Sequence, residues 1–273
     1  MDTIMETDPV SKSSVPNRNT HIEFLRNQLF QIETKWPHYG QLMKDTLELA
    51  DEQNAGSRIL CLERAYIYNG ISLFAPLFDK GELDVVDCVL NSAEERAGYQ
   101  RSWLDESKCV LQQSNLSGRV TELPVKSAFY DLVYIPNLVH HVKDQSKMFS
   151  EIARVMKPGA KGYIFEPLLR EIHQHPDDYV RYTPSGFEDV LVGHGLTMTD
   201  CRPVGGPFEA IAYCWVQALQ YFPEEVRKEK EKWFFDEHFK ELMKWNLENP
   251  INLVRKHTSF PIAYGVFFEK PFR

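Results

Sequence analysis

The sequence has no long apolar run and no dense cluster of basic residues. None of its apolar stretches approaches the roughly 20 residues that a membrane-spanning helix needs, so no membrane partner is expected. Lysine and arginine total 31 against 39 acidic residues, which gives a formal net charge of −8. Because binding to nucleic acid requires a concentrated positive surface, no nucleic-acid partner is expected either.

Cysteine is scarce, and an apolar signal segment is missing. The five cysteines form no Cys-x-x-Cys pair, and three of them lie in apolar runs, where reduced and buried thiols are typical. Residues 1–19 are polar and have no apolar signal core, so we expect them to form a disordered tail. Together these features predict a cytoplasmic protein.

The sequence does contain a regular alternation of short apolar runs and amphipathic stretches. Two helices are predicted first, at 21–36 and 39–51. Buried strands are predicted at 58–62, 83–87, 108–112, 131–135, 162–165 and 196–202, and helices at 71–78, 91–101, 145–156 and from Thr183 onward. Strands that alternate with helices in this way favour a mostly parallel sheet with helices on both faces.

The C-terminal part has a different character. After Gly205 and Gly206, the sequence predicts two long helices rich in aromatic residues, at 208–221 and 224–247, and then a final strand at 260–268. The predicted organisation is therefore a tail at 1–19, N-terminal helices at 20–56, an α/β core at 57–206, a helical insertion at 207–258 and a last core strand at 259–273.

Three consecutive segments carry a family signature. Leu123-Pro124 precedes the apolar run 131–135, the segment 137–141 ends in two histidines, and residues 151–159 read Glu-Ile-Ala-Arg-Val-Met-Lys-Pro-Gly. This order resembles class I S-adenosylmethionine (SAM) methyltransferases of the methyltransferase type 11 kind, in which the segments read L-P-F-x-x-x-x-F-D-x-V, L-x-H and E-x-x-R-V-L-K-P-G-G. The resemblance runs from about residue 57 to residue 202 and includes the last strand.

The resemblance implies a Rossmann-like fold: a mostly parallel seven-stranded sheet with helices on both faces, plus a helical insertion near the C-terminus. It implies S-adenosyl-L-methionine as the cofactor, bound across the carboxyl ends of the first, second and fourth strands, where open α/β sheets bind ligands. The insertion would act as a lid or as the surface of a homodimer. The implied activity is methyl transfer, and the acidic charge favours a small-molecule substrate.

The cofactor motif departs from the family pattern. The family places a Gly-rich turn after the first strand, because glycines let the backbone approach the cofactor closely. The corresponding positions here are Glu63, Ala65 and Ile67, so all three glycines are replaced. Cys61 takes the place of the acidic residue that opens the motif, and Arg119 takes an acidic position near the adenine.

The candidate cofactor-binding residues are Glu63, Ala65, Tyr66, Asp87 and Asn137. Asp87 ends the second strand, where the family uses a carboxylate to bind the ribose hydroxyls; capping of the next turn is the structural alternative. Glu63 is expected to contact the methionyl amine and Tyr66 or Tyr68 to cover the cofactor, whereas a surface ion pair is the simpler alternative for Glu63. The altered turn leaves three hypotheses open: SAM bound along a different backbone path, another ligand, or none.

Polar side chains follow the fourth and fifth strands, whose ends are neighbours in this fold. His140 and His141 are the candidates for general base or acceptor contact, because imidazole titrates near neutral pH. A structural role at the start of a helix is the alternative for His141. The candidate substrate-binding residues are Glu166, His173, Tyr179, Arg181 and Tyr182. An internal ion pair between Asp178 and Arg181 that shapes the loop is the alternative for the arginine.

Two other functions stay open at this point. A metal-assisted enzyme is compatible with the His-x-His pair and its acidic neighbours, but this short motif has many chance matches, and no metal ligand is assigned. A binding or regulatory protein on the same scaffold, with the cofactor site lost, is the other alternative. A fold does not by itself decide among these functions.

Overall fold

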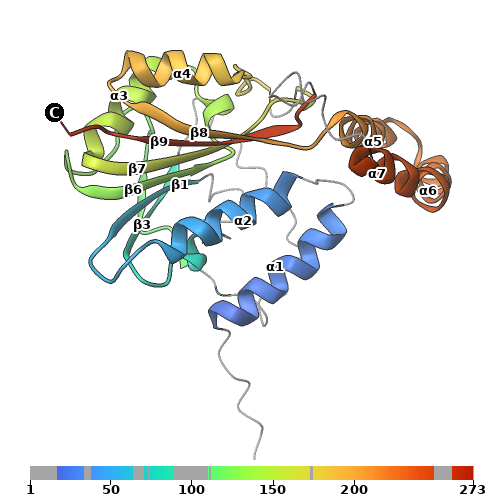
Figure 1. Ribbon diagram of the computed structural model, residues 1–273, viewed down its shortest axis with the longest axis horizontal. Helices are drawn as coiled ribbons and strands as arrows, with labels where there is room; N and C mark the ends of the chain where they lie inside the picture. Colours follow the sequence, from blue (N-terminus) through green and yellow to red (C-terminus); the bar gives the residue numbers. More distant parts are fainter. Residues whose placement is uncertain are drawn as a thin grey trace, which may run out of the picture.

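The computed structural model describes residues 17–33, 38–63, 71–72, 74–88, 110, 112–172, 175–248 and 260–272. Residues 1–16 of the tail predicted at 1–19 and the helix predicted at 91–101 lie outside the described residues. The prediction is wrong for Arg18 and Asn19, which begin the first helix. Figure 1 shows a central sheet with helices on both faces and a separate group of helices at one end.

The sheet has seven strands. In spatial order they are β5 (Leu116–Gly118), β3 (Glu82–Cys88), β1 (Arg58–Glu63), β6 (Tyr130–Pro136), β7 (Met156–Pro167), β9 (Ala263–Glu269) and β8 (Thr197–Val204). All pairs from β5 to β7 are parallel, whereas β9 is antiparallel to both of its neighbours. The strand order reverses at β1, so a ligand is expected at the carboxyl ends of β1, β3 and β6. The predicted fold class is confirmed.

Alternate residues of the strands divide between two cores, one on each face of the sheet. Ile59 and Cys61 belong to the core formed with α1 (Arg18–Glu33), α2 (His38–Asp51) and the 3₁₀ turn η2 (Ala75–Leu77). Leu60 and Leu62 belong to the core formed with α3 (Gln145–Val155) and α4 (Pro184–Gly193). This alternation is expected for a strand, and burial on both faces explains the continuous apolar runs of β1 and β6.

Two helices of the second face begin as their sequences predict. The side chain of Asp144 accepts a hydrogen bond from the Lys147 N–H at 3.0 Å and so caps α3. Thr183 caps α4 by accepting from the Gly186 N–H, and Pro184 follows at the first helical position. These caps fix the exits of the loops that run along the carboxyl end of the sheet.

A group of helices follows β8 at the carboxyl end of the sheet (Figure 1). It consists of α5 (Pro207–Ala218), the 3₁₀ turn η4 (Leu219–Tyr221), α6 (Glu224–Trp233), the π-helical turn η5 (Phe234–His238) and α7 (Phe239–Glu248). Gly205 starts the group with a φ of 80°, a left-handed conformation that glycine adopts without strain. The helices of the predicted insertion are therefore present, and the exact domain boundaries stay a prediction. None of the described helices combines the length and apolar character that a bilayer crossing requires.

Two local predictions are wrong. Residues 71–78 do not form one helix but contain the short strand β2 (Ile71–Ser72) and η2. Pro76 fits the first turn of η2 but would break the interior of a longer helix. The third strand of the sheet is not at 108–112: Gln112 begins β4 (Gln112–Gln113), which pairs with β2, and β5 takes the edge position beside β3. Three residues are too few for β5 to give a periodic pattern.

Candidate active site

Four of the predicted site residues meet at the carboxyl edge of the sheet. Glu63 is the last residue of β1 and lies in register with Asp87 of β3. Asn137 directly follows β6, and Glu166 is the penultimate residue of β7. The fold thus brings the ends of four strands to the place where ligands bind in open α/β sheets.

Glu63 stands where the family has the first glycine of its cofactor turn, and its side chain is buried. The residue is 5% exposed, which excludes an exposed surface ion pair. Ser72 hydrogen-bonds to the carboxyl group, and Oε1 has no hydrogen-bond partner among the described residues. Burial raises the pKa of Glu63 to about 7, and the bond from Ser72 offsets this only in part. The carboxyl therefore changes its charge near neutral pH.

Asp87 is the neighbour of Glu63 across the parallel ladder. It is 6% exposed, and residues in register on adjacent parallel strands point to the same face of the sheet. Two buried carboxyl groups thus lie side by side on strands that are about 4.8 Å apart. Buried carboxyl groups are stabilised by hydrogen-bond donors or by positive charge nearby. This edge of the sheet is suited to a ligand with a cation or several hydroxyl groups.

Asn137 turns the chain at the end of β6. Its φ of 51° lies in the left-handed region, which Asn tolerates better than most residues. Its N–H donates to the Phe165 carbonyl at 2.7 Å, so the exit of β6 is tied to the end of β7. This backbone shape, with its modest strain, directs the following turn across the edge of the sheet.

His140 and Glu166 form a buried pair. Both are at most 3% exposed, and the Nδ1 of His140 lies 2.5 Å from Oε2 of Glu166. The N–H groups of Val139 and His140 also donate to the same carboxyl, at 2.6 and 3.3 Å. Burial raises the pKa of Glu166 to about 8, although these N–H bonds and the charge of Arg181 act in the opposite direction. The carboxyl group thereby holds the imidazole in one orientation.

His141 is also buried, but it faces the loop that follows β7. Its Nδ1 contacts the carbonyl of Asp177 at 2.5 Å, and its ring lies 3.8 Å from the ring of His140, centroid to centroid. It belongs to the 3₁₀ turn η3 (Val139–His141). These contacts give His141 a structural role in holding the loop, and a catalytic role stays a prediction.

The loop after β7 packs on η3 through Tyr179. The Tyr179 N–H donates to the His140 carbonyl at 2.8 Å, and its hydroxyl donates to Asp177 at 3.0 Å. Arg181 donates through both terminal nitrogens to Asp178, so the predicted loop-shaping ion pair is present. The loop therefore brings Tyr179 and Arg181 close to His140.

Tyr182 lies farther from this group. Its hydroxyl donates to the side chain of Gln145 at 3.3 Å, and its ring packs against Phe149 and Phe187 in the core under α3 and α4. Four other predicted site residues, Ala65, Tyr66, Tyr68 and His173, lie outside the described residues. In the ranges that the structure describes, no cluster of three or more His, Cys, Asp or Glu side chains is arranged to hold a metal ion.

Two residues near the site were not predicted from the sequence. Ser72 bonds to Glu63 from β2, a contact that depends on a strand pair no periodicity indicates. His38, at the start of α2, stacks on Phe165 at 6.1 Å and meets the ring of Tyr213 at 5.7 Å, edge to face. Burial, with a smaller effect of Arg170, lowers the pKa of His38 to about 3, so it stays neutral. It joins α2 and α5 to the end of β7.

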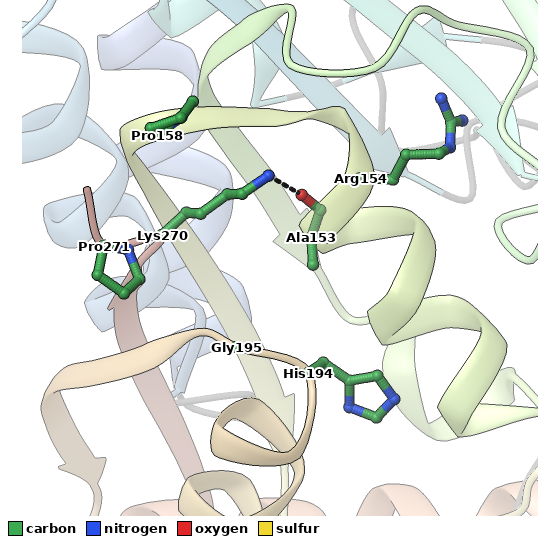
Figure 2. A pocket seen from close by; sticks show the side chains of 7 residues that line it. All are labelled: Ala153, Arg154, Pro158, His194, Gly195, Lys270 and Pro271. Carbon is green, nitrogen blue, oxygen red and sulfur yellow. Dashed lines mark hydrogen bonds between the residues drawn. The ribbon is translucent and has the colours of Figure 1, made fainter. Parts of the chain in front are cut away.

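A separate cavity of about 340 Å³ lies at the opposite end of the sheet. Figure 2 shows its lining residues, which are Ala153, Arg154, Pro158, His194, Gly195, Lys270 and Pro271. Lys270 donates to the carbonyls of Ala153 and Met156 at 2.7 and 3.0 Å and so caps the C-terminus of α3. Arg154 is paired with Glu151. These cations therefore stabilise the helix end, and the cavity is not the candidate active site.

Residues 81–164 match the sequence model of the methyltransferase domain family. The fold also matches one chain of the complex between the Haloferax volcanii Trm112 methyltransferase activator and a proposed methyltransferase, with a TM-score of 0.50, 18% identity and coverage of 95% of this chain and 99% of that chain. Residues 81–164 therefore match a methyltransferase domain, and the chain has the fold of class I methyltransferases. The matched segment contains Asp87, Asn137 and His140, whereas Glu63 and Glu166 lie outside it.

Two other solved methyltransferase structures match this fold with lower TM-scores. A proposed sarcosine dimethylglycine methyltransferase from Galdieria sulphuraria has a TM-score of 0.49, 14% identity and coverage of 85% and 84% of the two chains. Haemonchus contortus phosphoethanolamine N-methyltransferase 2, solved with S-adenosyl-L-methionine, has a TM-score of 0.43, 14% identity and coverage of 85% of this chain and 53% of that chain. Among curated proteins, none matches the sequence.

Proposed function

We propose that this protein is a SAM-dependent methyltransferase that acts on a small-molecule acceptor and binds its cofactor in an atypical way. The observation that supports this proposal is the composition of the carboxyl edge, where buried Glu63 and Asp87 lie in register on adjacent strands. SAM supplies an activated methyl group, and the protein's task is to position the acceptor and to manage its proton.

The residues at this edge fit the polar groups of SAM. Asp87 would accept hydrogen bonds from the ribose hydroxyls, and Glu63 would accept from the methionyl ammonium. The unpartnered Oε1 of Glu63 is the observation that favours such a contact, because a buried acceptor without a donor is unfavourable. Asn137 would shape the wall of the site, and Ala65 and Tyr66 would complete the turn.

On the acceptor side, His140 would take the proton of the methyl acceptor. Glu166 holds its ring and would stabilise the imidazolium that forms. Tyr179 belongs to the loop that packs on the turn of His140, is 36% exposed and would contact the acceptor directly. Arg181 would act through its ion pair with Asp178, which shapes the loop. His141, Tyr182 and His173 complete the residues that we expect to influence this side of the site.

The experiment is a thermal unfolding series followed by a turnover assay. S-adenosylhomocysteine at 100 times its Kd should stabilise the protein by about 2.7 kcal/mol and raise its Tm by several degrees. Asp87→Asn should reduce this shift, whereas Glu82→Gln, an exposed change on the same strand, should keep it. Formation of S-adenosylhomocysteine from SAM with a panel of amine, hydroxyl and thiol acceptors then tests methyl transfer.

A second candidate is a binding or regulatory protein on the same scaffold that does not transfer methyl groups. The observation that favours it is Glu63 itself, because a buried side chain fills the position at which the family keeps a glycine. Stabilisation by SAM without turnover on any acceptor would support this candidate. Absence of any stabilisation would contradict SAM binding and with it the methyltransferase proposal.

We further propose that the protein is cytoplasmic and forms a homodimer through its C-terminal helices. Neither α6 nor α7 contains a buried residue. Trp233, Trp245 and Leu247 are 41%, 38% and 81% exposed, and a second copy could cover these side chains. Light scattering coupled to size exclusion tests this: twice the chain mass of 31.8 kDa supports the dimer, and a monomer contradicts it.

A further inference from the structure

The position of Glu63 is unfavourable for the folded state on its own. Its neighbours on the same face of β1 are apolar, and an apolar side chain would fill the position without loss. Glu63 is instead buried, with Oε1 unpartnered among the described residues. A buried acceptor at the carboxyl end of β1, without a partner in the described part of the chain, indicates a binding role rather than a packing role.

The side chains that surround Glu63 on neighbouring strands are either acidic or uncharged. Asp87 of β3 lies beside it in register, Cys61 precedes it on the same face of β1, and Tyr134 faces it from β6. The pKa values of Cys61 and Tyr134 are raised well above their ordinary values by burial and by the charge of Glu63, so both stay neutral. Ser72 of β2 supplies one hydrogen bond. In this setting a neutral Glu63 carboxyl is favoured until a cation arrives.

We propose that Glu63 exchanges a proton for a cationic group of the cofactor. In the unliganded protein below neutral pH the carboxyl holds the proton; on binding, the proton leaves to solvent and the methionyl ammonium of SAM donates its N–H bonds to the resulting carboxylate. One positive charge replaces another, so the buried site keeps the same net charge when the cofactor binds. The inference rests on the proposed function, because it takes SAM as the ligand.

The exchange makes cofactor affinity depend on pH. Burial sets the pKa of the unliganded Glu63 carboxyl at about 7, and contact with an ammonium lowers it. Below pH 7 the proton competes with SAM for the carboxylate, so the affinity for SAM falls. Binding should be about fivefold weaker at pH 6 than at pH 7, and about tenfold weaker again for each further unit by which the pH is lowered. Free α-amino groups titrate near pH 8, so the ammonium of SAM stays charged over this range.

The test is calorimetric titration of the full chain at pH 6.5 in buffers of different ionisation enthalpy, which counts the protons released. Wild type should release about 0.8 proton on binding SAM, because that fraction of Glu63 is protonated at this pH. Glu63→Gln has no proton to release and should give a value near zero. The exposed control Glu82→Gln should behave as wild type does.

A second probe keeps the inference testable if Glu63→Gln does not fold. 5′-Methylthioadenosine has the nucleoside part of SAM but no ammonium, so wild type should bind it without releasing a proton. Equal proton release with SAM and with 5′-methylthioadenosine would overturn the exchange, as would unchanged release in a folded Glu63→Gln. If SAM binds without proton release, this inference alone fails. If SAM does not bind at all, the proposed function fails together with it.

Discussion

Replacing Glu166 by glutamine tests the acceptor side of the site. The wild-type carboxyl accepts from the Val139 and His140 N–H groups and contacts Nδ1 of His140. Glutamine has one acceptor oxygen and one donor NH₂ in the same space. If the oxygen keeps the 2.6 Å bond to Val139, the NH₂ must face Nδ1 and make it an acceptor. The His140 proton then sits on Nε2, and the ring cannot serve as a base.

The size and pH dependence of the effect follow from this change. General base catalysis contributes about 10²- to 10⁴-fold, so Glu166→Gln should lower kcat by at least about 100-fold. In wild type, burial raises the pKa of Glu166 to about 8. Below that pH the Glu166–His140 pair carries an extra proton, and above it His140 can accept a proton from the substrate. The wild-type rate should therefore rise with pH and reach a plateau above pH 8. The rate of the variant should not show this pH dependence.

The assay is the initial rate of S-adenosylhomocysteine formation between pH 6 and pH 9.5, with SAM saturating at each pH. Glu188→Gln, an exposed change on α4, is the matched control and should follow the wild-type profile. The reasoning would be refuted if Glu166→Gln kept the wild-type rate and pH profile. A loss of affinity for SAM with an unchanged kcat would also refute it, because that would place Glu166 on the cofactor side.

Three further predictions concern stability and the loop. Because the pKa of Glu63 rises from 4.5 to about 7 on folding, unliganded wild type should lose about 3 kcal/mol relative to Glu63→Gln as pH rises from 4.5 to 7.5; parallel stability curves would contradict this. Asp45→Asn weakens the buried bond from the Tyr163 hydroxyl and the ion pair with Arg202 and should cost about 2 kcal/mol in urea unfolding, and no loss would contradict a stabilising role of these contacts. Asp178→Asn should loosen the Arg181 pair and raise KM for the acceptor about tenfold with little change in kcat; an unchanged KM would contradict it.

The fold could be predicted where local pattern and tertiary structure agree. The helix at 145–155 has both an Asp cap and an apolar face with the spacing of a helix, and the apolar run at 131–135 is long enough to indicate a buried strand. The pattern failed at Pro76 and at Leu116, where short elements depend on pairing with distant strands. Such pairing leaves no periodic signal in a stretch of two or three residues.

The chemistry of the site was only partly predictable. The sequence placed Glu63 in the altered turn, but its surroundings include Ser72 and Tyr134, which lie on other strands. The sequence also named His140 and Glu166 as members of one cleft, whereas their direct contact depends on the register of β6 and β7. The residue types of the site can thus be predicted from the sequence. The contacts between these residues and their pKa values depend on the tertiary structure of the sheet.

Equilibrium binding of S-adenosylhomocysteine tests the central claim most directly, because it needs no knowledge of the acceptor. We predict saturable one-to-one binding to wild type and at least about tenfold weaker binding to Asp87→Asn, as expected for the loss of charged hydrogen bonds to a ribose. Glu82→Gln should bind as wild type does. Absence of binding to wild type, or equal affinity of wild type and Asp87→Asn, would contradict the assignment of the carboxyl edge as a SAM site.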